Sequence, residues 1–369
     1  MHFTCSQAKL IEALNIATKA LAGRTTNPIL EDILIETDSE QLILTCTDER
    51  ITIITRIPAV ILDSGRGCVP GKMFSEYVRK LPSDDVDIRM DERWMFTIRS
   101  ASARQNIAGH DADQFPMLPR MEDEREISLP QDMLRDMIQK TEFAIAQDDM
   151  REILTGCLLE IGGGDVNMVA LDGYRLALRR AKCSDVLEQV SAIIPGRAVG
   201  DIGKLLSTDE DAFAQLSFGG NKLHIRLENT EIFVILVEGE YVQYKPMLPK
   251  SFSTRVELDL EAFRSCIDRA SLSARAGSNN LILLRIESGT MVIEANSHIS
   301  EFHEELEVMQ EGADLRIAFN VKYLADVVRF IDAERIEMNM NSAVSPCVVT
   351  PVGDSDYVHL FLPVRTAAR

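Results

Sequence analysis

The sequence has no long hydrophobic run. No apolar stretch approaches the roughly 20 residues that a membrane-spanning helix needs. The N-terminal segment MHFTCS also lacks the basic and apolar regions of a signal peptide. These two absences predict a cytoplasmic protein that makes no contact with a membrane.

Cysteine and histidine are few and scattered. The seven cysteines include no Cys-x-x-Cys pair, and the six histidines include no His-x-x-x-His pair. Buried, reduced thiols are therefore a better interpretation than a disulfide framework or a zinc knuckle. The sequence predicts no metal ion and no cofactor.

Catalytic motifs are missing as well. There is no Gly-x-Ser-x-Gly motif and no Walker loop. The glycines at 162–164 lack the Gly-x-Gly-x-x-Gly pattern and favour a hairpin turn over a phosphate-binding loop. Carboxylate pairs such as Asp148-Asp149 and Glu304-Glu305 are expected by chance among 58 acidic residues. No catalytic residue is predicted, and the chain is expected not to be an enzyme.

Positive charge is the remaining shortage. The 369 residues include 58 acidic and 39 basic side chains, for a net charge of −19. Binding to phosphates calls for a basic surface, so this total argues against nucleic acid unless the charges are unevenly placed. The composition, 46% hydrophobic and 26% charged, is typical of a folded protein, and the length predicts two or three domains.

The sequence does contain a threefold repeat. The turn Asp172-Gly173-Tyr174-Arg175 has relatives that begin at Asp48 and at Asn296, each 124 residues away. Pro-Gly-Lys at 70–72, Pro-Gly-Arg at 195–197 and Asn-Val-Lys at 320–322 follow one another at intervals of 125 residues. Self-similarity at one fixed period indicates three copies of a domain.

Each repeat is expected to contain two amphipathic helices among strands. Apolar residues recur at i, i+3, i+4 and i+7 after the first and third of these segments, and the middle copy keeps the pattern with one position weakened to Gly203. A similar apolar stripe marks a helix near the start of each repeat. The expected helices span 6–20, 71–80, 130–147, 196–206, 260–273 and 320–330. The predicted fold is α+β, with domains at 1–122, 123–248 and 249–369, each running strand–helix–strands–helix–strands.

The charge is distributed unevenly between these helices and the rest of the chain. The six helices together carry +4, which leaves −23 elsewhere. If they share a surface, that surface could contact a DNA duplex without reading its bases, while the acidic exterior repels DNA. The alternative is that lysine and arginine are simply good helix formers.

Taken together, these features resemble the bacterial sliding-clamp family, the β subunits of DNA polymerase III. The resemblance rests on the threefold repeat, the Pro-Gly helix starts, the turn at Asp172 and the ending Leu362-Pro363-Val364-Arg365. It covers the chain from Phe3 to Arg365. It implies a head-to-tail homodimer that closes a ring around double-stranded DNA, with the helices lining the hole and the sheets outside.

The resemblance also implies which residues face DNA. A basic residue at the end of the first helix matches Arg24, and the basic starts of the second-type helices match Lys72 and Arg197. Helical position alone adds three further candidates, Arg79, Lys80 and Lys204. At Asp148, Glu152 and Ile153 the chain departs from clamps that carry glutamine and aromatic residues near the DNA.

A partner pocket is implied between the second and third domains. Family members bind there short extended peptides that carry glutamine and large apolar side chains. The partners are the polymerase III α subunit, the clamp-loader δ subunit and other proteins with clamp-binding motifs. The matching positions are Arg151, Leu154, Leu171, Gly173, Tyr174, Arg175, Leu176, Val242, Pro246, Met247, Val344, Pro346, Leu362, Pro363, Val364 and Arg365. The alternative, ordinary core residues, accounts for the leucines and valines but not for the arginines.

The dimer contact is expected to include Ile107 and Leu272 as an apolar seam, with Gln105 at a position where some relatives have an aromatic residue. The function implied by the resemblance is a processivity clamp that tethers the replicative polymerase. Two other hypotheses remain open at this point: a specialised or resistance-type clamp homologue, and an acidic hydrolase built from duplicated domains.

Overall fold

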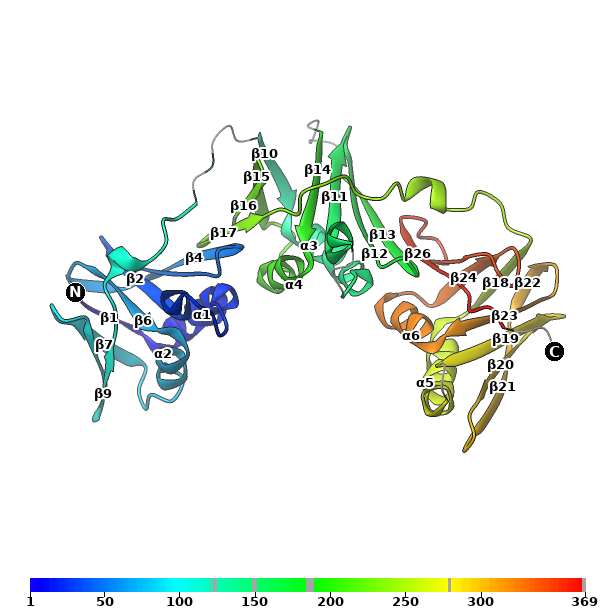
Figure 1. The fold of residues 1–369 in the computed structure, drawn as a ribbon, viewed down its shortest axis with the longest axis horizontal. Coiled ribbons are helices and arrows are strands. Elements are labelled where there is room, and N and C mark those ends of the chain that lie inside the picture. Colours follow the sequence, from blue (N-terminus) through cyan, green and yellow to red (C-terminus); the bar gives the residue numbers. More distant parts are fainter. Residues whose placement is uncertain (120, 122–124, 148–150, 184–188, 278–279, 367–369) are drawn as a thin grey trace. The chain divides into compact units, whose positions relative to one another are not determined.

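The computed structural model describes residues 1–369 except 120, 122–124, 148–150, 184–188, 278–279 and 367–369 (Figure 1). The described residues form two compact units. The first comprises Met1–Asp132 and Lys204–Leu236, and the second Met133–Gly203 and Val237–Arg369. The division falls inside the middle repeat, so each unit combines one terminal repeat with part of the middle one.

The first unit contains two antiparallel sheets and two α-helices, with short 3-10 turns η1 (Thr18–Ala20), η2 (Pro28–Glu31) and η3 (Ala112–Gln114). The helices are α1 (Gln7–Ala17) and α2 (Gly71–Val78), which lie side by side (Figure 1). The strands are β1 (His2–Ser6), β2 (Asp32–Asp38), β3 (Gln41–Thr47), β4 (Ile51–Pro58), β5 (Val60–Asp63), β6 (Arg66–Pro70), β7 (Asp85–Met90), β8 (Met95–Ser100), β9 (Ala103–Ala108), β10 (Arg125–Pro130), β15 (Phe213–Gly219), β16 (Lys222–Arg226) and β17 (Thr230–Ile235).

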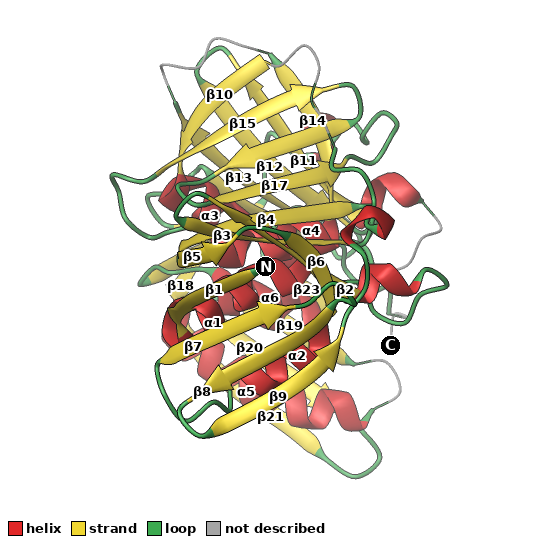
Figure 2. Cartoon of the chain, turned by 90° about the vertical axis from the view of Figure 1, so that its left-hand side faces the viewer, coloured by secondary structure: helices red, strands yellow, loops and turns green. Residues whose placement is uncertain are grey.

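One sheet of the first unit joins two repeats. Its order is β10-β15-β16-β17-β4-β3-β2-β6, so strands of the middle repeat continue directly into strands of the first (Figure 2). The joint is the β17–β4 pair, where Thr230 lies opposite Thr55 and their hydroxyl oxygens are 3.1 Å apart. The second sheet, β5-β1-β7-β8-β9, belongs to the first repeat alone.

The second unit contains four α-helices, two sheets and the 3-10 turns η4 (Glu142–Ala144), η5 (Glu152–Thr155) and η6 (Lys245–Met247). The helices are α3 (Gln131–Gln139), α4 (Gly196–Leu205), α5 (Leu260–Ala276) and α6 (Val321–Phe330), where the first two residues of α3 and the last two of α4 are counted with the first unit. The strands are β11 (Gly156–Gly162), β12 (Asp165–Leu171), β13 (Arg175–Lys182), β14 (Val190–Pro195), β18 (Thr254–Asp259), β19 (Leu281–Glu287), β20 (Thr290–Asn296), β21 (Glu301–Glu307), β22 (Met309–Gly312), β23 (Leu315–Asn320), β24 (Arg335–Met340), β25 (Cys347–Pro351) and β26 (Tyr357–Phe361).

The second unit repeats the construction of the first. Its nine-stranded sheet, β14-β11-β12-β13-β26-β25-β24-β18-β22, joins the middle repeat to the third through β13 and β26, where Leu176 lies opposite Leu360. The four-stranded sheet β21-β20-β19-β23 belongs to the third repeat. Along the chain, each repeat runs strand–helix–strands–helix–strands, which confirms the predicted α+β fold of three similar domains.

The Pro-Gly helix starts have a steric reason. A Cβ on Gly71 would lie 2.8 Å from the Leu21 side chain, and one on Gly196 would lie 2.9 Å from the Thr155 carbonyl oxygen. The first helical residue therefore packs so closely that only glycine fits. The third copy lacks this glycine and instead caps α6 with Asn320, whose Oδ1 accepts a hydrogen bond from the Lys322 amide at 2.9 Å.

Two sequence-based expectations were wrong in detail. The helix expected at 130–147 ends at Gln139, because the Thr141 hydroxyl donates to the Met137 carbonyl at 2.7 Å and the chain then makes only the short turn η4. The third copy of the central turn begins at Ser297, not Asn296. The Ser297 hydroxyl accepts from the Ser300 amide at 3.0 Å, the role that Asp48 and Asp172 play in their turns.

Candidate functional site

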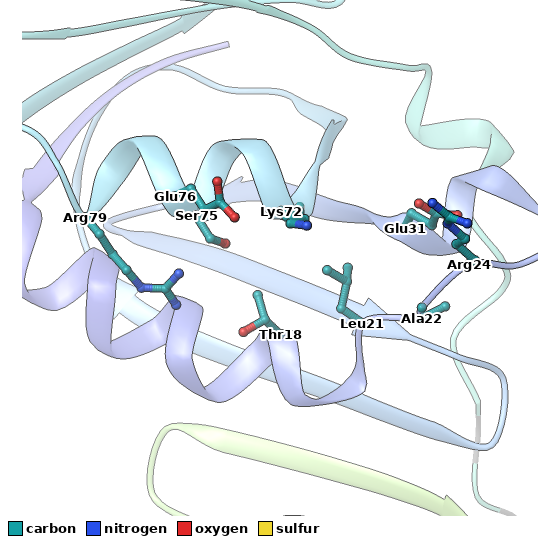
Figure 3. A pocket seen from close by; sticks show the side chains of 11 residues that line it. Thr18, Leu21, Ala22, Arg24, Glu31, Lys72, Ser75, Glu76 and Arg79 are labelled. Atoms are coloured by element: carbon teal, nitrogen blue, oxygen red, sulfur yellow. The ribbon is translucent and has the colours of Figure 1, made fainter.

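Three of the predicted DNA-facing residues line one pocket in the first unit. Arg24, Lys72 and Arg79 surround a cavity of about 470 Å³ between the end of α1 and the helix α2. Figure 3 shows Lys72 on α2, Arg79 at one end of the pocket and Arg24 at the other. The remaining lining residues are Thr18, Leu21, Ala22, Gly23, Glu31, Gly71, Ser75 and Glu76.

The charges in this pocket leave room for an anion. Two carboxylates, Glu31 and Glu76, accompany the three cations, so the lining carries a net +1. The Arg79 guanidinium donates to Asn15 Oδ1 at 2.8 Å. Arg24 and Lys72 are exposed, and within the described ranges neither forms an ion pair. Free cationic groups of this kind can contact phosphate oxygens without reading bases.

The other predicted DNA-facing residues lie elsewhere. Lys80 is exposed just after α2 but does not line the pocket. Arg197 and Lys204 are exposed on α4, a different helix, and Arg197 Nε lies 3.9 Å from Asp201 Oδ2. Asp148 falls outside the described residues.

The central turn is built around the Asp172 carboxylate. Its Oδ1 accepts hydrogen bonds from the amides of Tyr174 at 2.9 Å and Arg175 at 3.0 Å. Gly173 has φ of 90°, the left-handed region that favours glycine. A Cβ on Gly173 would lie 2.8 Å from the guanidinium of the exposed Arg151, a flexible group that can move aside, so the positive φ is the reason that favours glycine here.

Arg175 anchors this turn to two other elements. Its guanidinium donates to Asp172 Oδ2 at 2.9 Å, to the Phe143 carbonyl at 2.6 Å and to the carboxylate of Asp326 on α6. The rings of Phe143 and Tyr323 lie 5.5 and 5.3 Å from it. Only 8% of the residue is exposed. The structure therefore places Arg175 as an internal anchor rather than an open docking contact.

Beneath the turn lies an apolar cluster. Predicted pocket residues Leu154, Leu171 and Leu176 are buried in it, and Val242 packs against it. The remaining buried members are Leu158, Val169, Leu178, Ile193, Tyr241, Tyr244, Val348, Val358 and Leu360. Leu154, Leu171 and Leu176 are therefore residues of this core cluster.

Exposed apolar side chains belong to the same segments. Tyr174 is 62% exposed, and its carbonyl accepts from the Leu362 amide at 2.8 Å, which brings the turn and the segment after β26 together. Met247, Val344 and Leu362 are also exposed. Large apolar side chains left in water beside an apolar cluster are typical of a binding surface.

The other predicted pocket residues lie in or next to the same loops and turns. Pro246 lies in η6, Pro346 directly precedes β25, and Pro363 follows β26. The Val364 amide donates to the Ala318 carbonyl at 2.8 Å, which holds the end of the chain against β23. Arg151 and Arg365 are exposed, and neither forms an ion pair among the residues described.

Sequence reasoning missed the residues that hold this site together. The Tyr244 hydroxyl donates to Glu160 Oε2 at 2.6 Å, and Tyr241 lies in the apolar cluster. Both lie in the stretch of the middle repeat from which only Val242, Pro246 and Met247 were predicted as site residues. Two of only six tyrosines in the chain occur within four residues there, which was an available sign that the stretch packs.

Burial shifts the pKa values of two titratable groups in the second unit. His359 is buried between aromatic rings, and burial, together with the nearby Arg175 cation, lowers its pKa to about 3. Burial raises the pKa of the Cys157 thiol to about 12. Across the described part of the chain, no cluster of His, Cys, Asp or Glu side chains could hold a metal ion, and no helix is long and apolar enough to cross a membrane.

The two predicted dimer residues have different surroundings. Ile107 is only 3% exposed, because on β9 it lies opposite the buried Phe96 and points into the core of its own domain. This burial leaves little of the Ile107 side chain for the predicted apolar seam. Leu272 on α5 is 73% exposed and is available to a partner. Gln105, two residues before Ile107, is half-buried.

Comparison with known protein families covers nearly the whole chain. Residues 1–119 match the N-terminal domain of the DNA polymerase III beta subunit, residues 128–243 its central domain and residues 245–365 its C-terminal domain. The beta sliding clamp of Staphylococcus aureus is 33% identical over 378 residues, covering 99% of this chain and 100% of the relative. That of Halalkalibacterium halodurans is 34% identical over 381 residues, with the same coverage.

Solved structures give the same result. The DNA polymerase sliding clamp from Bacillus subtilis superposes with a TM-score of 0.95 at 31% identity, with full coverage of both chains. A DNA polymerase III beta subunit from Eubacterium rectale gives 0.94 at 32% identity, covering 99% of this chain and 100% of that one. These findings support the clamp and not the hydrolase hypothesis. The chain belongs to the DNA polymerase III beta subunit family, the sliding clamps, which are processivity factors without catalytic activity of their own.

Proposed function

We propose that this chain is a DNA sliding clamp that closes with a second copy of itself around duplex DNA and tethers the replicative polymerase. The observation that carries the proposal is the match of all three domains, in order and over nearly the full length, to the clamp family. A ring holds DNA by enclosure, so weak phosphate contacts are sufficient and no base readout is required.

The DNA contacts are proposed to come from the exposed basic residues of the helical regions. The pocket that contains Arg24, Lys72 and Arg79 supports this, because two of its cations have no internal partner among the described residues. Lys80, Arg197 and Lys204 are proposed as additional contacts of the same kind. In a chain with a net charge of −19, such sites are local exceptions to a repulsive field.

A comparison of closed circular DNA with linear DNA tests whether the protein encloses the duplex. After loading by a bacterial clamp loader, the protein should stay on a closed circular plasmid during a high-salt wash and leave after a restriction enzyme linearises the plasmid. Gel filtration of labelled protein with the plasmid measures both. Equal loss from circular and linear DNA would show that enclosure is not the mode of binding.

The partner site is proposed to be the surface around Tyr174 in the second unit. Exposed apolar side chains, the apolar cluster below them and the free cations Arg151 and Arg365 suit an extended peptide with apolar and polar groups. The proposed ligands are peptide segments of the polymerase III α subunit, the clamp-loader δ subunit and other proteins with clamp-binding motifs. Their site of action would be the cytoplasm, at the nucleoid.

Met247 offers a cleaner test of this site than Leu176. Leu176 is buried in the cluster, so a charge there would disturb folding, whereas Met247 is exposed. Met247→Glu should weaken binding of a fluorescent α-subunit peptide at least tenfold in an anisotropy titration and leave the melting temperature unchanged. Met309→Glu, at another exposed methionine, on β22, is the matched control. Unchanged peptide affinity in Met247→Glu would place the site elsewhere.

A further inference from the structure

A second pocket in the first unit has no role in the function proposed above. Its volume is about 290 Å³, and it lies where the turn after β3, the segment 116–119 and the strands β16 and β17 meet. It shares no residue with the basic pocket at Arg24. The lining residues are Thr47, Glu49, Arg50, Thr52, Pro116, Met117, Leu118, Pro119, Lys222, Phe233, Val234 and Ile235.

The turn at this pocket has the backbone of the turn at the peptide site. Asp48 Oδ1 accepts hydrogen bonds from the amides of Arg50 at 3.0 Å and Ile51 at 2.8 Å, as Asp172 Oδ1 does from Tyr174 and Arg175. The amide of each aspartate donates to the carbonyl three residues later, at 3.2 Å in both turns. The two turns are thus equivalent copies within one chain.

The neighbours of the two turns are also equivalent. Each turn precedes the strand that joins its repeat to the next, β4 with β17 in the first unit and β13 with β26 in the second. In the second unit, the segment that follows the last strand of the repeat packs Tyr241 and Val242 onto the apolar cluster. In the first unit, residues 116–119 follow η3 and line the pocket.

The side chains differ in a way that leaves this turn open. Ile51 replaces the anchoring Arg175, so no guanidinium ties the turn to another helix. Glu49 replaces Gly173 and adopts φ of 70°, a left-handed conformation that is unusual for a glutamate. Arg50 replaces Tyr174 and presents an exposed cation at the pocket.

The lining combines apolar surface with unpaired positive charge. Phe233, Val234 and Ile235 supply an apolar wall, and Met117 is 93% exposed. Within the part of the chain that the structure describes, neither Arg50 nor Lys222 forms an ion pair, and Glu49 is the one acidic residue among those that line the pocket. A ligand that suits this lining has an apolar group next to an anionic group.

We propose that this pocket is a second docking site for an extended peptide that carries one large apolar side chain beside a carboxylate. The volume, at the small end for ligand pockets, accommodates a side chain rather than a whole peptide. The carboxylate would lie near Arg50 and Lys222. Such a contact is weak by itself and acts best for a partner already tethered to the clamp. The inference rests on the proposed function in one respect, the comparison of the turn at Asp48 with the turn at Asp172 in the proposed peptide site.

Photo-crosslinking on the full-length chain tests this proposal. The probe is an acetylated Leu-Asp-Leu-Phe peptide with a free terminal carboxylate, in which benzoylphenylalanine replaces phenylalanine. After irradiation and digestion, mass spectrometry should find labelled peptides from the first unit (116–119 or 233–235) and from the second (237–252). Absence of label from the first unit at saturating probe would overturn the proposal.

Charge-reversal variants separate the two sites. Lys222→Glu should reduce first-unit label at least tenfold and leave second-unit label unchanged, and Arg50→Ala should reduce it several-fold. Met247→Glu should do the reverse. Lys182→Glu, at an exposed lysine on β13 that pairs with Asp165, controls for the reversal of a surface charge as such. First-unit label that is indifferent to Lys222→Glu would contradict the proposal. If the wild-type chain is labelled in the first unit but not in the second, that result would instead count against the proposed function.

Competition identifies the class of ligand. Unlabelled peptide should displace the first-unit label, while a single-stranded DNA oligonucleotide at equal charge concentration should not. Displacement by the oligonucleotide and not by peptide would assign the pocket to nucleic acid and reject the peptide.

Discussion

At the scale of single residues, Arg175 was predicted to bind a partner but stabilises the fold instead. Two carboxylates, a backbone carbonyl and two aromatic rings surround its guanidinium, and little of it reaches solvent. A buried cation with satisfied partners contributes little net stability, but removing it leaves the two partly buried carboxylates of Asp172 and Asp326 without their cation. The consequence is that Arg175 substitutions affect folding before they affect binding.

This leads to a prediction for Arg175→Gln. The change should destabilise the chain by about 3–5 kcal/mol, because it leaves Asp172 and Asp326 without their cation. Urea unfolding measures the loss. Adding Asp326→Asn should restore about 1–3 kcal/mol of it, since the two residues are in direct contact. Arg151→Gln, at an exposed arginine, is the control and should stay within about 0.5 kcal/mol of wild type. Additive effects of the two changes would contradict the coupling.

Glu231 makes the first unit sensitive to acid. A hydrogen bond with His224 Nε2 at 3.0 Å and the Arg56 guanidinium 2.8 Å away lower the pKa of this carboxyl to about 2. The unfolded chain titrates at the ordinary value for glutamate, about 4.3. Because the folded pKa is the lower of the two, the stabilisation is complete above the unfolded value. It is lost as the pH falls through the folded value.

We therefore expect a pH-dependent effect of Glu231→Gln. At pH 7 the variant should be less stable than wild type by about 1.5–3 kcal/mol, the usual contribution of a hydrogen bond to a charged group. The difference should shrink as the pH falls from about 4.5 toward 2. Urea unfolding at several pH values measures it, with Glu228→Gln, an exposed neighbour, as the control. A difference that stays constant with pH would refute the assignment.

At the scale of elements, the start of α2 links fold to function. Pro70 and Gly71 allow the helix to begin in close contact with Leu21, and this contact places Lys72 at the pocket beside Arg24. The steric demand and the charge therefore arise from the same three-residue motif. The basic residue Lys72 faces solvent because the preceding residue, Gly71, packs against Leu21.

The element-scale prediction concerns salt dependence. Each phosphate contact contributes about 0.9 to the slope of log K against log salt concentration on duplex DNA. Arg24→Ala combined with Lys72→Ala should therefore reduce the slope by about 2, as measured by anisotropy with a labelled duplex. Arg226→Ala is the control, since that arginine is paired with Glu126 on a strand. An unchanged slope in the double variant would remove both residues from the DNA contact.

At the scale of the whole molecule, the two single-repeat sheets have edge strands that pair with a neighbouring strand on one side only. Strand β9 is an edge of the five-stranded sheet, and β21 is an edge of the four-stranded sheet. The strand β21 contains four glutamates among its seven residues, while β9 contains Arg104. Edge strands with opposite charge suit pairing between two copies of the chain, as a closed ring requires.

Leu272 provides the prediction at this scale. The wild-type chain should sediment as a dimer of about twice 41.2 kDa. Leu272→Glu should raise the dimer dissociation constant at least tenfold, about 1.4 kcal/mol, if this exposed leucine lies in the contact. Sedimentation velocity at several concentrations measures the change, and Leu62→Glu, at an exposed leucine on β5, is the control. Dissociation equal to that of the control would exclude Leu272 from the interface.

The sequence by itself determined the threefold fold, because a repeat of about 124 residues and the spacing of apolar residues are local properties of the chain. It also marked the basic helix starts, since glycine and lysine there are adjacent. The alignment of the third turn with the other two was harder to predict. This turn starts at Ser297, where a serine hydroxyl replaces the aspartate carboxylate as hydrogen-bond acceptor. Serine is a weaker turn signal than aspartate, so the sequence alone did not indicate the correct start.

The tertiary structure alone decided which side chains are available. Ile107 and Arg175 looked like surface residues, but packing buries Ile107 beside Phe96 and encloses Arg175 between two carboxylates. Long-range partners such as Asp326, 151 residues from Arg175, leave no mark on local sequence. Burial of a side chain depends on which segments far apart in the sequence pack against each other. A local sequence pattern predicts the segments but not the contacts between them.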